Sequence, residues 1–344
     1  MKYNFDNVSF WISPKVFTKE CPKEKLQYAV GALLYMPADK KNVASKIISG
    51  EFSYVKSLVL DLEDSLGDDN IHSAFDNIVD FCKEINDAID GNRFSHENIP
   101  LIFVRVRCAE HMNMVVESLG SLVKIISGFN IPKFGPSSCD EYIRTFKGIS
   151  EKVMNEYSSK LYMMPILESD AIMNKQVRTN NLSQLYDKLL EIKDSVLNIR
   201  VGGADFNNIF SIRRGCKDTI WDTHVVADCL ADIVNVFGKD YVVSGPVWEF
   251  FEGSDAINGL QAEIHKDLLN GCFGKTCIHP NQLLAAQECY IVDYNDYQDA
   301  VDVLNMDESA SGVKKSIQGR MNEKKTHSKW AKKTIELAHI YGVR

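Results

Sequence analysis

The stretch SLVLDLEDSL, residues 57–66, decides the fold. It begins with an apolar run long enough for a buried strand and contains three carboxylates, Asp61, Glu63 and Asp64, before helical periodicity begins. Acidic side chains at this point are expected at the mouth of a parallel sheet, because the carboxyl ends of parallel strands converge around one cavity. The stretch therefore predicts a parallel sheet with a polar site at that end.

Seven further apolar runs recur between longer amphipathic segments, as in the helical spacing of Phe75, Ile78, Cys82 and Ile85. Strands alternating with helices predict parallel pairing, and eight repeats within about 250 residues have the size of a closed (β/α)8 TIM barrel. A doubly wound open sheet is the alternative, weakened because no GxGxxG opens the helix after the second run. The expected strands are residues 31–36, 57–62, 101–106, 124–131, 161–167, 197–203, 240–245 and 272–278.

Two extensions flank the expected barrel of residues 31–291. Residues 1–30 carry mixed signals and are interpreted as an N-terminal arm. Residues 292–325 are polar and charged and are expected to be mobile, whereas the apolar face marked by Trp330, Leu337 and Tyr341 predicts a final helix that docks. We therefore interpret residues 292–344 as a lid segment followed by a docking helix.

Composition narrows the possible partners and compartment. The 344 residues carry a net charge of −8, which argues against a nucleic-acid or anionic-membrane partner. The first residues lack the apolar core of a signal peptide and no segment approaches a membrane span, so we expect a cytoplasmic protein. The nine cysteines include no CxxC pair, which favours reduced thiols over disulfides or a zinc site.

Charged residues stand at the ends of most expected strands. In a barrel these ends form one ring, so the side chains would face a shared pocket. Burying so many charges without partners is costly, and they must pair with each other, bind a metal or hold a substrate. The residues are Asp61, Glu63, Asp64, Arg105, Arg107, Lys133, Glu168, Asp205 and His279.

Glu168 and Asp205 are the predicted metal pair. Both follow apolar strands directly, and carboxylate oxygens without a nearby histidine or thiolate suit Mg²⁺. The alternative is that each pairs with an arginine of a neighbouring strand. Arg105 could clamp a substrate carboxylate, or could instead be a structural partner of Glu63 or Asp64.

Six motifs in this order and approximate spacing resemble the citrate lyase beta-subunit-like family. They are DLEDSL at 61–66, VRVR at 104–107, IPK at 131–133, PILES at 165–169, GGAD at 202–205 and GKTCIHPNQ at 274–282. This family is the HpcH/HpaI aldolase and malyl-CoA lyase group of the phosphoenolpyruvate/pyruvate superfamily. The resemblance covers about residues 31–282, and the DLED and GK-x-x-IHP-x-Q motifs are specific to it.

The resemblance implies a TIM barrel that binds Mg²⁺ through Glu168 and Asp205 and cleaves or forms a carbon-carbon bond through a metal-stabilised enolate. A divalent cation and a guanidinium would both stabilise the developing negative charge. The implied catalytic residues are Arg105, Glu63, Asp64 and Glu323, and the implied substrate-binding residues are Arg105, Lys133, Gly203, Ala204 and His279.

The chain departs from the family pattern at three places. Gly31 and Ala32 stand where relatives begin the first strand with an Arg-Ser pair, so a cation that often helps hold coenzyme A is missing. Ser244, Gly245 and Pro246 stand where malyl-CoA-lyase-like members carry Asp-Gly-Pro after the seventh strand, so serine takes the place of the aspartate. Glu323 is the nearest acid to the place of the C-terminal aspartate that closes over a neighbouring subunit in many relatives.

The leading hypothesis is a Mg²⁺-dependent carbon-carbon lyase or aldolase. Its substrate would be a small 2-oxo or hydroxy carboxylic acid, with a CoA thioester as one option, and the chain would form a homo-oligomer, a trimer or hexamer. One alternative is a catalytically inactive barrel that binds a ligand or regulates, motivated by the departures above. Another is an isomerase or phosphotransferase of the same superfamily.

Overall fold

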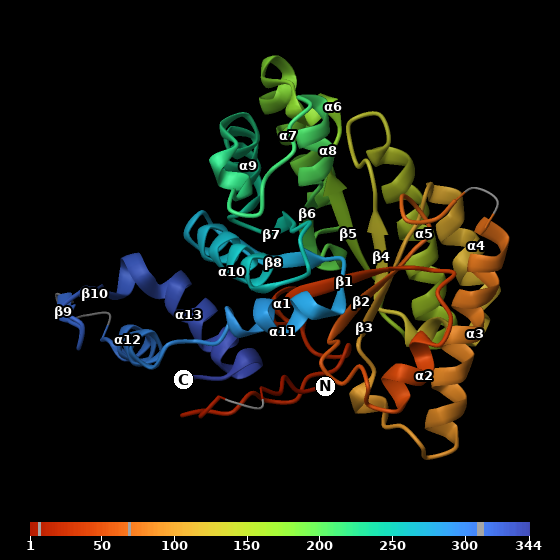
Figure 1. The fold of residues 1–344 in the computed structure, drawn as a ribbon, viewed down its shortest axis with the longest axis horizontal. Helices are drawn as coiled ribbons and strands as arrows, with labels where there is room; N and C mark the ends of the chain where they lie inside the picture. Colours follow the sequence, from red (N-terminus) through yellow and green to blue (C-terminus); the bar gives the residue numbers. More distant parts are fainter. Residues whose placement is uncertain (6–7, 68–69, 308–312) are drawn as a thin grey trace.

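Eight parallel strands close into a barrel in the order in which they occur in the chain, and β8 pairs with β1 (Figure 1). The computed structural model describes residues 1–5, 8–67, 70–307 and 313–344. The predicted TIM barrel is therefore confirmed. Its strands are β1 Ala32–Pro37, β2 Ser57–Asp61, β3 Leu101–Arg105, β4 Gly128–Ile131, β5 Tyr162–Leu167, β6 Asn198–Val201, β7 Val242–Val247 and β8 Cys272–Cys277.

Each strand overlaps an expected one with bounds that differ by up to a few residues, and the differences at β4 and β6 have local reasons. The run expected from residue 124 enters β4 only at Gly128, because Gly120–Ile125 forms a 3-10 helix that buries Val123 and Ile125. The sixth strand ends at Val201, because helix α8 already begins at Gly203. Apolar character alone does not distinguish a strand from a short buried helical turn.

Helices connect the strands and surround the barrel (Figure 1). The helix expected after residue 70 is α3, and it buries Phe75, Ile78, Cys82 and Ile85 as the spacing predicts. The helices are α1 Lys23–Ala29, α2 Val43–Ile48, α3 Ile71–Asp90, α4 Ala109–Leu119, α5 Cys139–Tyr157, α6 Asp170–Met173, α7 Lys175–Leu190, α8 Gly203–Ile209, α9 His224–Phe237, α10 Ser254–Leu269, α11 Leu283–Glu288, α12 Tyr294–Asn305 and α13 Lys324–Tyr341.

The amino end of the barrel is closed by aromatic side chains from both ends of the chain. Tyr3 of the N-terminal arm stacks on Phe17 and lies against Tyr341 of α13, with ring centroids 4.5 Å apart in the latter pair. The Tyr341 hydroxyl donates to the carbonyl of Tyr28 at 2.7 Å. A Cβ at Gly31 would lie 2.2 Å from the Tyr341 hydroxyl oxygen, so this position has no room for the arginine that the family resemblance leads one to expect.

The C-terminal extension contains more helix and strand than its composition predicts. The expected final helix is present as α13, but the segment expected to be mobile contains α12 and a hairpin of β9 Val313–Lys315 and β10 Met321–Glu323. Ala300 and Val303 of α12 pack against Ala331 of α13, and Asp299 accepts a hydrogen bond from Arg320 at 2.8 Å. Residues 308–312 of that segment lie outside the described residues. Figure 1 shows the hairpin at the far end of the extension, away from the barrel.

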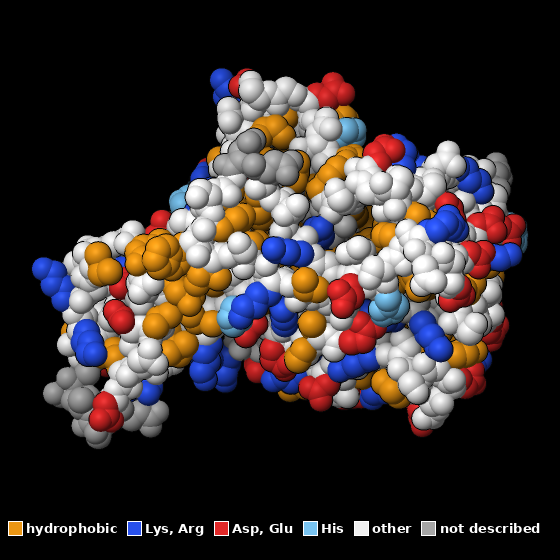
Figure 2. Space-filling model, turned by 90° about the horizontal axis from the view of Figure 1, so that it is seen from below, with side chains coloured by type: hydrophobic (Ala, Val, Ile, Leu, Met, Phe, Trp, Pro, Cys, Tyr) orange, Lys and Arg blue, Asp and Glu red, His pale blue; other side chains and the backbone are white. Residues whose placement is uncertain are grey.

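The surface of the molecule mixes charges of both signs. Figure 2 shows acidic and basic side chains interspersed over the face seen from below, and hydrophobic side chains gathered where the C-terminal extension meets the barrel. Among the helices that the structure describes, none combines the length and apolar character needed to span a membrane.

Candidate active site

A cavity of about 450 Å³ opens at the carboxyl ends of the barrel strands. Parallel topology brings together side chains that are far apart in the sequence, because every strand ends on this side. The charged residues that line the cavity are Asp61, Asp64, Arg105, Glu168, Arg200 and Asp205. All of these residues except Arg200 were expected from the sequence.

Strand register places Arg105 directly beside Asp61. The two residues are paired in the β2–β3 ladder, and Arg105 donates from Nε at 2.6 Å and from Nη2 at 2.7 Å to the two Asp61 oxygens. Its Nη1 lies 2.9 Å from Glu63 and 3.3 Å from Asp64. Burial raises the pKa of Asp61, but the hydrogen bonds and charge of Arg105 outweigh burial and lower it overall. Each guanidinium nitrogen of Arg105 thus already has a carboxylate partner.

Lys133 contacts both Glu63, beside Arg105, and Glu168, of the carboxylate pair with Asp205. Its Nζ lies 2.7 Å from Glu63, and its backbone N–H donates to Glu168 Oε1 at 2.6 Å. Lys133 has a φ of 48°, in the left-handed region that non-glycine residues rarely occupy. Such strain is most often found at functional sites. The strained turn after β4 therefore directs the side chain of Lys133 to Glu63 and its backbone N–H to Glu168.

Glu168 and Asp205 form a carboxylate pair without a cationic partner. In the described part of the chain, neither makes an ion pair with lysine or arginine, so the alternative of two structural ion pairs is not what the structure adopts. A Cβ on Gly202 would lie 2.5 Å from Glu168 Oε2 and 3.1 Å from Asp205 Oδ2, so the missing side chain leaves space beside both oxygens. Burial, followed by the charge of Asp205, raises the pKa of Glu168 to about 8.

This carboxylate pair fits a hard divalent cation. Mg²⁺ is commonly held by one or two carboxylates and keeps its other positions for water or substrate. Within residues 1–5, 8–67, 70–307 and 313–344, no group of three or more His, Cys, Asp or Glu side chains could hold a metal ion. A cation at Glu168 and Asp205 would therefore take its further ligands from water or substrate. A cation beside Glu168 and Asp205 would offset the repulsion that now raises the pKa of Glu168.

Arg200 is the functional candidate that sequence reasoning missed. It lies within β6, is 1% exposed and lines the cavity. Its Nη2 donates to the Thr276 hydroxyl at 2.5 Å, whereas Nε and Nη1 have no partner among the described residues. Arg200 does not stand at a strand end but inside the run LNIRV, residues 197–201. An arginine within such a run was itself the available signal.

The family model for C-C bond lyases of the TIM-barrel fold matches residues 24–343. The chain belongs to this family. The match extends beyond the barrel through the C-terminal helices, and it confirms the family resemblance that the strand-end motifs indicate. A comparison with curated proteins found no match in sequence.

Solved structures resemble this C-C bond lyase family member at low identity. A citrate lyase from Burkholderia xenovorans is 12% identical with a TM-score of 0.68, over 96% of this chain and 94% of that one. CitE from Mycobacterium tuberculosis, in complex with magnesium, acetoacetate and coenzyme A, is 15% identical with a TM-score of 0.60, over 91% and 99%. A malate synthase from Haloferax volcanii is 16% identical with a TM-score of 0.53, over 74% and 71%. At these identities the likeness establishes the fold.

Of the remaining predicted residues, one lines the cavity and two have structural contacts. Ala204 lines the cavity, while Gly203 is buried against Pro246, where a Cβ would approach to 2.6 Å. His279 caps the 3-10 helix of residues 280–282 by accepting from the Asn281 N–H at 3.2 Å, and its ring stacks on Phe251. Such capping matches the structural role that a lone histidine at a strand end most often has.

Glu323 lies in β10, in the hairpin at the far end of the C-terminal extension (Figure 1). It accepts a hydrogen bond from the Thr326 hydroxyl at 2.8 Å, and its backbone N–H donates to His327 Nδ1 at 3.1 Å. It is not among the residues that line the cavity of its own chain. A catalytic role for Glu323 would therefore require the cavity of a second copy.

A second set of buried charges lies between β8 and α10, and we call it the buried network. Lys275 contacts Glu263 at 2.5 Å and Asp267 at 2.8 Å. Glu263 also pairs with Arg214, and Asp267 accepts from Trp221 Nε1 at 2.8 Å. Lys275 belongs to the GKTCIHPNQ motif, so part of this family signal serves to attach α10 to the barrel.

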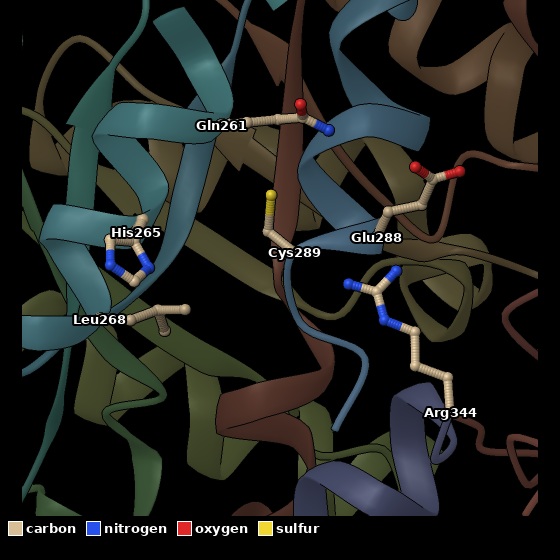
Figure 3. A pocket seen from close by; sticks show the side chains of 6 residues that line it. All are labelled: Gln261, His265, Leu268, Glu288, Cys289 and Arg344. Carbon is tan, nitrogen blue, oxygen red and sulfur yellow. The ribbon is translucent and has the colours of Figure 1, made fainter. Parts of the chain in front are cut away.

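A separate pocket of about 340 Å³ lies outside the barrel, between α10, α11 and Arg344. Figure 3 shows its lining side chains, with Gln261, His265 and Leu268 coming from α10 and Glu288 from α11. None of its polar side chains belongs to the buried, unpartnered groups of the described residues. The barrel cavity is therefore the better candidate for the active site.

Proposed function

We propose that the protein is a carbon-carbon bond lyase or aldolase that acts on a small 2-oxo or hydroxy carboxylic acid with Mg²⁺ held by Glu168 and Asp205. The observation that carries the proposal is the pair of carboxylates beside Gly202, Glu168 buried and Asp205 half-buried, which has no cationic partner among the described residues. Family membership supports a carbon-carbon bond as the target.

The chain's own residues prepare this site before the substrate arrives. The backbone N–H of Lys133 orients Glu168, and Asp61 holds Arg105 in a fixed direction at the cavity wall. Arg107 donates to the carbonyls of Leu62 and Leu66, which steadies the loop that carries Glu63 and Asp64. When bound, Mg²⁺ would supply Lewis-acid stabilisation of the negative charge that develops beside a carbonyl on carbon-carbon cleavage.

Two solved structures support the choice of substrate class. CitE from M. tuberculosis was crystallised with magnesium and pyruvate, and the citrate lyase beta subunit of that organism with magnesium and oxaloacetate. Both are low-identity relatives in fold, and the M. tuberculosis structure with coenzyme A keeps a thioester substrate open for this chain. The predicted substrate contacts are Arg105, Lys133, Gly203, Ala204 and His279, and Glu323 would act in the cavity of a neighbouring copy in a homo-oligomer.

Mg²⁺ binding tests the proposal directly. Isothermal titration with Mg²⁺ in the presence of pyruvate should show binding to the wild type, and Glu168→Ala or Asp205→Ala should each weaken it at least about tenfold while the fold stays intact. Glu191→Ala is a matched control, because Glu191 is exposed and its ion pairs in the described part of the chain are with the surface residues Lys147 and Lys188. Wild-type affinity in Asp205→Ala would contradict the metal assignment.

The second candidate is a barrel that binds a ligand without turning it over. The observation that favours it is Arg105, each of whose nitrogens already contacts Asp61, Glu63 or Asp64, so that few of its five N–H donors remain for a substrate. Binding of Mg²⁺ and an oxo acid, together with no cleavage of oxo acids, hydroxy acids or thioesters, would favour this candidate.

A further inference from the structure

The inner end of the barrel cavity carries a cation, Arg200, that makes no ion pair with an acidic side chain among the described residues. Arg200 lies within β6, whereas Asp205 lies beyond the end of that strand, in α8. Because a strand rises about 3.3 Å per residue, Arg200 lies deeper in the barrel than the carboxylate pair. Both line the same cavity, which thus has an acidic mouth and a cationic inner end.

The immediate surroundings of Arg200 do not balance its charge. The Thr276 hydroxyl is a neutral acceptor, and the Tyr35 ring has its centroid 6.0 Å from the guanidinium carbon. Burial raises the pKa of Tyr35, so its phenol stays neutral and provides no counter-charge. Two nitrogens of Arg200 remain unpartnered among the described residues. A buried guanidinium in this state is costly unless an anion joins it.

Arg105 cannot take the same role at equal cost. Its guanidinium carbon lies 5.3 Å from the centroid of the same Tyr35 ring. Its three nitrogens, however, already contact Asp61, Glu63 and Asp64. A substrate carboxylate at Arg105 would have to share nitrogens that already contact these acids, whereas at Arg200 it would meet the N–H donors of two unpartnered nitrogens. Of the two cavity arginines, Arg200 is therefore the one available to an anion.

We propose that Arg200, flanked by Tyr35 and Thr276, binds a carboxylate of the substrate, and that the substrate is a short dicarboxylic acid whose 2-oxo or 2-hydroxy end lies at Glu168 and Asp205. The proposal rests on the function proposed above and deepens it. A cavity of about 450 Å³ holds an acid of this size. Strands enclose the inner end, so a coenzyme A group would have to extend toward the mouth instead.

A matched pair of ligands tests this carboxylate site. Malate and 2-hydroxybutanoate differ only in a carboxylate against a methyl group at the far end. In isothermal titrations with Mg²⁺ present, wild type should bind malate roughly ten- to hundredfold more tightly, the range expected of a charge-assisted hydrogen bond. Arg200→Met, which keeps a similar length without charge, should reduce this ratio to about one, and Arg200→Lys should keep part of it.

The titrations separate the two proposals. If Mg²⁺ binds wild type and Arg200→Met equally but only wild type prefers malate, the carboxylate site is supported. If both proteins bind Mg²⁺ and show the same ratio, the carboxylate site is overturned and the metal assignment stands. If Mg²⁺ does not bind but wild type alone still prefers malate, the carboxylate site stands and the proposed function fails. Chemical denaturation of Arg200→Met confirms that the variant is folded.

Discussion

The buried network and the charged residues around the cavity differ in the balance of acids and cations. In the buried network, two cations, Arg214 and Lys275, face two carboxylates, Glu263 and Asp267. Around the cavity, five carboxylates face three cations, and some groups stay unpartnered while others are shared. The carboxylates are those of Asp61, Glu63, Asp64, Glu168 and Asp205, and the cations are those of Arg105, Lys133 and Arg200. A balanced set attaches a helix to the barrel, whereas an unbalanced set retains charge for a ligand.

The largest expected effect separates the two sets by stability. Lys275→Met leaves Glu263 and Asp267 buried with one cation fewer, so we expect a loss of about 3–5 kcal/mol in the free energy of unfolding. Arg200→Met removes a buried charge that lacks an acidic partner, so its unfolding free energy should stay within about 1 kcal/mol of wild type or rise. Urea denaturation measures both. Equal destabilisation would contradict the distinction between the two sets.

The next effect concerns the space beside Glu168 and Asp205, the carboxylates proposed to hold Mg²⁺. Gly202→Ala would place a Cβ 2.3 Å from the Glu168 Cβ and 2.5 Å from its Oε2, so the glutamate must move. We expect Mg²⁺ affinity, measured by isothermal titration, to fall at least about tenfold. Gly148→Ala in α5 is the control, because a Cβ there meets nothing within 4 Å, and it should stabilise the helix by about 0.5–1 kcal/mol without changing Mg²⁺ affinity.

The smallest expected effect is a pH dependence that belongs to the cavity set. Folded, metal-free protein should keep a proton on Glu168 up to a pKa of about 8, whereas the unfolded chain releases it near 4.5. Because the folded state binds more protons in this window, the free energy of unfolding should fall as pH rises, by at most about 1.4 kcal/mol per pH unit.

Denaturation of wild type and Glu168→Gln at several pH values within that window measures this effect. The difference in unfolding free energy between the two proteins should change in favour of the variant as pH rises. Saturating Mg²⁺ should remove the decline in wild type, because the cation replaces the proton. Parallel pH profiles without metal would mean that Glu168 has an ordinary pKa.

Much of the cavity was predictable because its residues stand where apolar strands end. Asp61 and Glu168 follow directly from that rule, since parallel topology brings strand ends together whatever loops connect them. The helix α12 and the β9–β10 hairpin of the C-terminal extension were not predictable in this way. Asp299 and Arg320 stabilise it by a contact between α12 and the hairpin, and local polarity does not reveal such a contact.

The sequence by itself determined the strand and helix order, the barrel and the acidic strand ends, because hydrophobic periodicity and parallel pairing depend on local pattern. Only the tertiary structure decided which charges are neutralised. Strand register places Asp61 beside Arg105, whereas Arg200, at the cavity wall, makes no ion pair with any acid that the structure describes. Whether a charged side chain holds the fold or awaits a ligand depends on its neighbours across the barrel, and these come from distant strands.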